Sequence, residues 1–312
     1  MTQPLEPTLD ALQNPFARYV AATRPAFLSA SLMACIVGLA IARHDGVAID
    51  ALLAAVTLVF ALLAQAGVNV LNDYYDALNG TDARNVERIF PFTGGSRFIQ
   101  NGVLTLAQTR NFGFSLMACV AAAGLWLMLA SSPQLVYVGF AGLFIGWAYS
   151  APPFRLNSRG WGELCVAAGF LAITVGTDFV QRKGFDGAPF VAGLSYALLV
   201  TNLLYINQFP DRKADTEAGK LHWVARLDVQ HARWGYALIV LMAYAWLLLA
   251  VLLSWLPVKA LLALLALPLS VKAARLLLRH AAQPRQLGDA IKLTIAAMMA
   301  HGALLSLGLI LG

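Results

Sequence analysis

Two short stretches of the sequence place several carboxylates directly after long apolar runs. The first reads NVLNDYYDALNGTD and the second reads NQFPDRKADTEAGK. Their aspartates are Asp73, Asp76 and Asp82 in the first stretch and Asp211 and Asp215 in the second. The whole chain has only 16 acidic residues and is 59% hydrophobic, so these two clusters hold a large part of a small acidic inventory.

The spacing within each cluster suits a divalent cation. Asp73 and Asp76 are three residues apart and Asp211 and Asp215 are four apart, so each pair shares one face if the apolar run continues as a helix. Like charges on one face repel, and a bound cation removes that repulsion. Mg²⁺ prefers such hard oxygen ligands and completes its shell with water and substrate phosphates. Two such pairs facing each other across a cavity would hold Mg²⁺ around a diphosphate.

Amide side chains precede both clusters. Asn69 and Asn72 precede the first and Asn207 precedes the second, and their oxygen and N–H groups suit phosphate or metal-bound water. The alternative is that the carboxylates are solvated charges that only mark the aqueous surface. Two similar clusters, each following an apolar run, favour a binding site over that alternative.

Transmembrane helices are the elements that must position these clusters. With 12% charged residues and a mean hydropathy of +0.68, the composition is typical of an integral membrane protein. A helix needs about 17 to 25 apolar residues to cross a bilayer. The stretches that meet this requirement are 26–42, 50–71, 111–130, 134–150, 161–180, 189–207, 234–254, 257–277 and 290–311.

We therefore predict an all-α polytopic bundle of about nine transmembrane helices. Residues 1–25 would form a cytoplasmic N-terminal segment and residues 26–312 a single transmembrane domain. Cys35, Cys119 and Cys165 fall singly inside predicted spans and are interpreted as packing residues. Asp178, at the far end of the fifth span, is interpreted as a charge in an outer loop.

The distribution of Lys and Arg predicts the orientation, because cytoplasmic loops carry the excess of both. With the N-terminus inside, the outer side holds only Arg43, Arg182, Lys183 and Lys259. This arrangement places both acidic clusters in the cytoplasm and the C-terminus outside, in what we expect to be a bacterial inner (plasma) membrane. Basic loops beside an anionic leaflet also explain the net charge of +6 without a nucleic-acid partner, and no obligatory protein partner is inferred.

The two acidic stretches resemble the aspartate-rich motifs of the UbiA superfamily of intramembrane prenyltransferases. The first has the spaced form of the branch that contains 1,4-dihydroxy-2-naphthoate prenyltransferase. Two stretches between them, PFTGGSRFIQNGVL (91–104) and YSAPPFRLNSRGWGE (149–163), agree with the same branch. The resemblance covers the motif segments between about 69 and 226.

The resemblance implies a helical bundle that encloses a cavity under a cytoplasmic cap of motif loops, at about 69–104 and 205–226. In such proteins Mg²⁺ held by both motifs binds the diphosphate of a polyprenyl donor. The metal ligands that it implies are Asp73, Asp76, Asp82, Asp211 and Asp215. The supporting groups that it implies are Asn69, Asn72 and Asn207, with Lys220 as the basic residue that closes the second motif. After Lys220 the chain reads LHW where the branch commonly has Arg and Thr, which leaves the role of this stretch open.

The expected chemistry also needs fixed cations. Breaking the C1–O bond of an allylic diphosphate leaves negative charge on the leaving group and an allyl cation behind. Arg97, Lys220 and Arg226 are the cations we expect near the phosphates, and Arg155 and Arg159 would bind either the diphosphate or an acceptor carboxylate. The alternative for all five is that they only reflect the cytoplasmic excess of basic residues.

Aromatic side chains flank the motifs and could stabilise the allyl cation through their ring faces. They are Tyr149, Tyr205, Phe154 and Phe209. The alternative is that they anchor the span ends at the interface or pack in the core.

These observations predict Mg²⁺-dependent transfer of a polyprenyl chain to an aromatic quinone precursor. The branch resemblance favours 1,4-dihydroxy-2-naphthoate, a precursor of menaquinone, as the acceptor. Within the family, 4-hydroxybenzoate, a haem and a glycerol phosphate lipid are alternatives. A cation-coupled transporter is an alternative of another class, although transporters place such carboxylates near the midplane of the membrane and here they sit at span ends.

Overall fold

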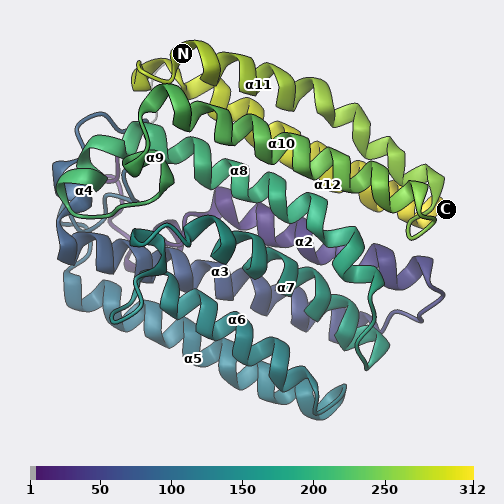
Figure 1. Cartoon of the computed structure of the whole chain (residues 1–312). Coiled ribbons are helices and arrows are strands. Elements are labelled where there is room, and N and C mark those ends of the chain that lie inside the picture. The colour runs from purple at the N-terminus through teal and green to yellow at the C-terminus, as the bar shows by residue number, and fades with distance from the viewer. Residues whose placement is uncertain (1–4) are drawn as a thin grey trace.

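The computed structural model describes residues 5–312, and the regular secondary structure in that range is all helical (Figure 1). Eight helical segments are long and apolar enough to cross a membrane. They are α2 (Pro25–His44), α3 (Ala51–Asn79), α5 (Leu106–Ala130), α7 (Gly162–Arg182), α8 (Ala188–Glu217), α10 (Val229–Leu252), the consecutive pair η2 (Val258–Ala266) and α11 (Leu267–His280), and α12 (Gly288–Leu311).

A ninth apolar helix, α6 (Leu135–Ser150), is shorter than these. Its 16 residues extend about 24 Å at 1.5 Å per residue, which is less than the hydrocarbon thickness. Each of the nine predicted stretches therefore coincides with an apolar helical segment. The remaining helices are short: α1 (Pro15–Ala22), α4 (Thr81–Arg84), η1 (Leu156–Ser158), α9 (Trp223–Arg226) and η3 (Pro284–Gln286).

The acidic motifs begin on helices, and this corrects the prediction that they lie in cap loops. Helix α3 continues to Asn79 and α8 continues to Glu217, well past the predicted span ends. Helix α3 ends where Gly80 adopts a left-handed conformation, with φ of 80°, because glycine takes that conformation without strain. The cap consists of the segments that follow these helix ends.

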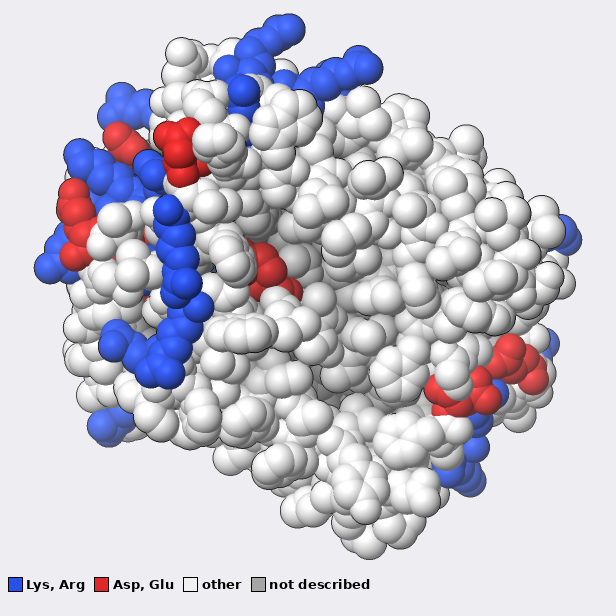
Figure 2. All heavy atoms as spheres, viewed as in Figure 1, with Lys and Arg blue, Asp and Glu red and all other residues white. Residues whose placement is uncertain are grey.

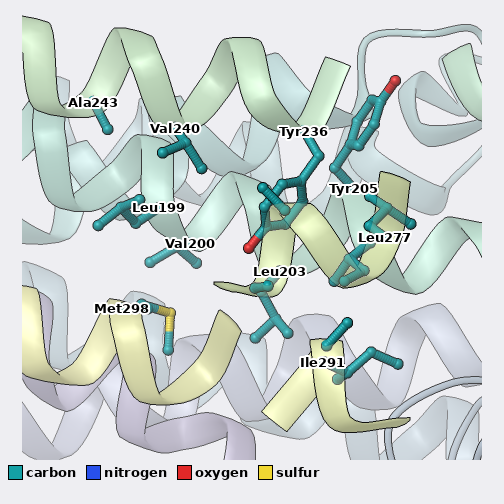
Figure 3. Close-up of a cluster of buried hydrophobic side chains, with 14 of the residues drawn as sticks. Leu199, Val200, Leu203, Tyr205, Tyr236, Val240, Ala243, Leu277, Ile291 and Met298 are labelled. Carbon is teal, nitrogen blue, oxygen red and sulfur yellow. The ribbon is translucent and has the colours of Figure 1, made fainter. Parts of the chain in front are cut away.

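Helices α2, α8, α10, α11 and α12 form a closely packed half of the bundle. In the most apolar stretch of α8, 72% of the residues are buried. In Figure 3, Val200 of α8 lies between Val240 of α10 and Met298 of α12. Gly302 of α12 permits close approach, because a Cβ atom there would lie 2.3 Å from the Met33 side chain of α2.

Helices α3, α5, α6 and α7 form the other half, which is more open. Only 17% of the most apolar stretch is buried in each of α3 and α5. Large apolar side chains such as Leu129 and Phe140 point outward, with 82% and 72% of their surface exposed. Figure 2 shows Lys and Arg gathered mainly at the end where α4 and α9 lie, a smaller charged group at the opposite end, and an uncharged surface between them. An uncharged surface between charged ends suits a bundle that faces lipid.

The interpretation of Asp178 as an outer-loop charge is wrong. Asp178 lies within α7, its side chain is buried, and it accepts hydrogen bonds of 2.8 Å from Arg182 one helical turn later. Arg182 also donates to Asp45, at 2.6 Å. The ion pair compensates a carboxylate that is withdrawn from water.

The three cysteines differ in their surroundings. Cys35 and Cys165 are buried, whereas Cys119 on α5 is exposed and does not pack inside the bundle. The packing interpretation therefore fails for Cys119. Cys165 also lies on the wall of the large cavity described below.

Candidate active site

A cavity of about 650 Å³ lies among α2, α3, α5, α6, α7 and α8. Side chains such as Phe60, Val120 and Leu143 make most of its wall apolar. The described Asp, Arg and Lys side chains that line it are all at the end where α3 and α8 finish: Arg24, Asp76, Asp82, Asp211, Asp215 and Lys220. Figure 2 shows acidic atoms inside a hollow next to the basic end of the molecule. The cavity is therefore apolar along most of its wall and charged at one end.

Asp76 is one of two carboxylates of the first motif that line the cavity, and Asp82 is the other. Its Oδ2 accepts hydrogen bonds from Asn72 Nδ2 at 3.1 Å and from Lys220 Nζ at 2.9 Å. Asn79 Nδ2 donates to Oδ1 at 3.2 Å. Asn69, also on the cavity wall, donates to the backbone oxygen of Thr23 at 3.1 Å.

Asp73 lies beside the cavity and does not line it. It forms an ion pair with Arg24 at the start of α2 and accepts the backbone N–H of Ser96 at 3.2 Å. Only 4% of Asp73 is exposed. In this structure Asp73 therefore holds Arg24 on the cavity wall at the charged end.

The second motif contributes Asp211 and Asp215 from the last turns of α8. Asp211 accepts hydrogen bonds from Asn85 Nδ2 at 2.5 Å and from the backbone N–H of Gly94 at 3.3 Å. Asp215 Oδ2 lies 2.9 Å from His222 Nε2. The two motifs thus meet through segments that follow each of them in sequence.

Lys220 connects the two acidic clusters. Its Nζ is 2.9 Å from Asp76 and 3.7 Å from Asp215. Burial by itself lowers the pKa of the Lys220 ammonium, but the charges of Asp215 and Asp76 outweigh burial and hold that pKa well above its ordinary value. Lys220 is therefore a fixed cation at the charged end of the cavity.

A glycine pair brings the backbone of the loop before α5 against Asp82. Gly95 has φ of +74°, and a Cβ atom on it would lie 2.4 Å from Asp82 Oδ2. Glycine is required there both by conformation and by space. Burial, followed by the charges of Asp76 and Asp73, raises the pKa of the Asp82 carboxyl well above its ordinary value.

Four of the cations predicted to bind substrate do not line the cavity. Arg97 donates to the backbone oxygen of Asp82 and so holds the cap. Arg155 and Arg159 are exposed. Arg226 donates to the backbone oxygens of Leu221 and Arg159, at 2.6 and 3.0 Å. This placement gives no support to direct phosphate contacts by these four, and Lys220 is the predicted cation that does reach the cavity.

Of the four aromatic residues predicted to stabilise the allyl cation, one lines the cavity and three do not. Tyr149 lines the cavity. Tyr205 is buried away from it, and its hydroxyl donates to the backbone oxygen of Ala232 at 2.7 Å. Phe209 packs beside Tyr205 in the core, and Phe154 packs against aromatic side chains of α6. The prediction of a cation-stabilising ring therefore retains only Tyr149.

Sequence reasoning did not identify three residues at this end. They are Arg24 and Asn85, to which no motif assigns a role, and His222, which falls in the LHW stretch whose role the family pattern leaves open. No local pattern distinguishes them. Each joins the site through a partner at least seven residues away, so only the folded chain reveals it.

The donor set fits Mg²⁺. Between residues 5 and 312, no three His, Cys, Asp or Glu side chains converge on one point. Mg²⁺ is usually held by one or two carboxylates, and water and phosphates complete its shell. Asp215 Oδ1 and Asn207 Oδ1 are buried oxygens without hydrogen-bond partners among the described residues, and both residues line the charged end of the cavity. Oxygen acceptors that lack a donor there are free to bind a hard cation or its waters.

Comparison with known proteins agrees with this geometry. The chain is 31% identical over 264 residues to the 1,4-dihydroxy-2-naphthoate octaprenyltransferase of Mycobacterium leprae, with 83% of this chain and 85% of that protein covered. It is 30% identical over 299 residues to the protein of the same name from Escherichia coli, with 92% and 93% covered.

Solved structures show the same fold. The structure of a UbiA homolog from Archaeoglobus fulgidus bound to DMAPP and Mg²⁺ superimposes with a TM-score of 0.61 at 13% identity, and it covers 93% of this chain and 99% of that chain. The all-helical architecture and the membrane location predicted from composition are thereby confirmed. The model of the UbiA prenyltransferase family matches residues 31–297, which include both acidic motifs and all of the bundle except the start of α2 and the end of α12. This integral membrane protein therefore belongs to the UbiA prenyltransferase family.

Proposed function

We propose that the protein transfers a polyprenyl group from polyprenyl diphosphate to 1,4-dihydroxy-2-naphthoate and uses Mg²⁺ as its cofactor. The observation that carries the proposal is the meeting of two carboxylate-bearing helix ends, those of α3 and α8, at the charged end of an apolar cavity. The names of the relatives that match most of the chain support the choice of acceptor.

The cavity explains how a donor would be oriented. A polyprenyl tail is surrounded by apolar groups both in the bilayer and in the cavity, so entering the cavity changes its solvation energy little. The tail by itself therefore does not decide which way round the donor binds. The diphosphate, in contrast, is strongly favoured only at the charged end. The side chains of Asp76, Asp211 and Asp215 would hold Mg²⁺ there, with Asn207 as a neutral oxygen donor.

The charged groups would act on the bond that breaks. When bound, Mg²⁺ neutralises the charge that develops on the diphosphate oxygens. Lys220 and Arg24 are already fixed at this end by their ion pairs, so they stabilise the leaving group without reorganising. The apolar wall keeps water from the allyl cation, and Tyr149 offers it a ring face.

An assay of the purified protein in detergent tests this proposal. The reaction would contain a polyprenyl diphosphate, Mg²⁺ and one of several acceptors, and mass spectrometry would identify the product. A prenylated naphthalene product that depends on Mg²⁺ supports the proposal. Product with 4-hydroxybenzoate or another acceptor alone would overturn the choice of acceptor. Solute uptake driven by an ion gradient, without product from any acceptor, would favour a transporter instead.

We further propose that the N-terminus and the charged end of the cavity face the cytoplasm of a bacterial inner membrane. The support is the excess of Lys and Arg at that end of the molecule. Reporters fused after Arg110 and after Lys183 should lie inside and outside the membrane, respectively. Two reporters on the same side would contradict the orientation.

A further inference from the structure

The segment after α8 folds back over the charged end of the cavity. Gly219 adopts φ of +75°, and the backbone N–H of Lys220 then donates to the backbone oxygen of Asp215 at 2.8 Å. The next residue, Leu221, donates its N–H to the backbone oxygen of Ser158 at 2.9 Å. These bonds fix the chain so that His222, only 1% exposed, lies on the cavity wall.

The two ring nitrogens of His222 have different partners. The backbone N–H of Ala225 donates to Nδ1 at 3.2 Å, so Nδ1 must be an acceptor. The hydrogen of the neutral ring is therefore on Nε2, which lies 2.9 Å from Asp215 Oδ2. The first bond caps α9, and the second one holds a carboxylate of the second motif.

The two oxygens of the Asp215 carboxylate therefore have different surroundings. Oδ2 is occupied by His222, whereas Oδ1 is buried without a hydrogen-bond partner and lies 3.7 Å from Lys220 Nζ. A carboxylate held by one oxygen cannot rotate freely about its last bond. Its other oxygen is then presented in one direction, towards the end of the cavity that holds the remaining carboxylates.

We propose that His222 is a positioning residue that orients Asp215 so that Oδ1 receives Mg²⁺. This inference rests on the proposed function, because it names a residue that serves the same charged end. Hydrogen bonds that orient metal-binding carboxylates commonly change metal affinity by about 10-fold to 100-fold when they are removed. The LHW stretch thus acquires a role that the motif resemblance does not supply.

Two substitutions separate this role from the capping of α9. In His222→Gln the side-chain amide reaches the position of Nε2, so it can still donate to Asp215, but the cap acceptor is lost. In His222→Asn the shorter side chain can accept from Ala225 N–H and cannot reach Asp215. His231→Gln is the matched control, because His231 is exposed, lies 3.7 Å from Asp228 and does not line the cavity.

The experiment uses the full-length protein in detergent and two measurements. The first is the rise in melting temperature with MgCl₂ in the presence of inorganic pyrophosphate. The second is the Mg²⁺ concentration that gives half-maximal prenyl transfer, measured separately from kcat. We expect His222→Asn to need about tenfold more Mg²⁺ than the wild type in both. His222→Gln and His231→Gln should stay within about threefold, a margin well below that range.

The outcomes distinguish this inference from the proposed function. Equal Mg²⁺ requirements in the Asn variant and the wild type, or equal losses in the Asn and Gln variants, would overturn the role of His222 while transfer by the wild type leaves the function standing. A wild type that gains stability with Mg²⁺ and pyrophosphate but transfers no prenyl group would overturn the function and still test His222. A wild type with no such gain would overturn the proposed positioning.

Discussion

The two sides of helix α8 face different surroundings. On one side α8 packs against α10 and α12, with side chains such as Leu199 and Tyr205 in a continuous core. On the other side it borders the cavity, with Asn207, Asp211 and Asp215 at its charged end. Helix α8 is thus part of the closely packed half and also forms the wall of the cavity that it shares with the open half.

This difference shows how a lipid-embedded chain can hold charges in fixed positions. Helices gain no hydrophobic driving force by leaving lipid for one another, so close packing and small residues supply the stability of the packed half. The helices of the open half pack less closely and enclose the cavity. A site needs rigid support to hold its groups in place, and α8 obtains it from the packed half. We therefore expect substitutions at the charged end of the cavity to lower activity, and substitutions in the packed half to lower stability.

The largest effects should come from the charged end of the cavity. Asp76→Asn and Asp211→Asn keep the side-chain size and remove the charge, so kcat should fall by about 10²-fold to 10³-fold in each. If both serve one diphosphate, the double variant should be little worse than either single variant. Rates of prenyl transfer at saturating Mg²⁺ measure this. Near-full activity in a folded single variant would mean that the charge of that residue does not act on the leaving diphosphate.

Leu277→Ala tests the packed half. Leu277 is fully buried in the core, so truncation should lower the free energy of unfolding by about 2 kcal/mol, near the lower end of the usual range. The lower end applies because the apolar transfer term is weak in lipid. Leu143→Ala on the cavity wall is the matched control and should change the melting temperature less. Equal losses in the two variants would remove the distinction between the halves.

Lys220→Ala tests the cation that joins the two motifs. Removing it leaves Asp76 and Asp215 without a shared counter-charge, and the leaving diphosphate without a fixed donor. We expect kcat/KM for the prenyl diphosphate to fall about tenfold, the equivalent of one charged hydrogen bond. The KM for the aromatic acceptor should be unchanged. A rise in the acceptor KM instead would place Lys220 beside the acceptor.

The smallest effect should come from Arg159→Ala, the matched exposed cation. Within residues 5–312 its guanidinium donates only to the backbone oxygen of Pro153, at 2.9 Å, and it is solvent-exposed. Surface contacts of this kind contribute less than about 1 kcal/mol. Donor kcat/KM should therefore change less than twofold. A loss as large as that of Lys220→Ala would show that the exposed arginines meet substrate before it enters the cavity.

Hydropathy and residue spacing determined much of this protein, because both act locally along the chain. A run of apolar residues long enough to cross a bilayer must satisfy its own backbone hydrogen bonds, so it forms a helix wherever it occurs. The spacing of Asp73 and Asp76, and of Asp211 and Asp215, predicted a shared face only if each apolar run continued as a helix, and the structure shows that both runs do continue. The predicted family rests on the resemblance of the motif sequences, which is also a local property of the chain.

The tertiary structure decided which charged groups actually meet. Arg24 and Asp73 are 49 residues apart and Asn85 and Asp211 are 126 apart, and nothing local in the sequence pairs them. The fold likewise turned Arg155 and Arg159 outward and Lys220 inward, although the sequence predicts all three on the same side of the membrane. A charge count cannot make that distinction, because the position of each side chain depends on how distant helices pack and on where each segment reverses.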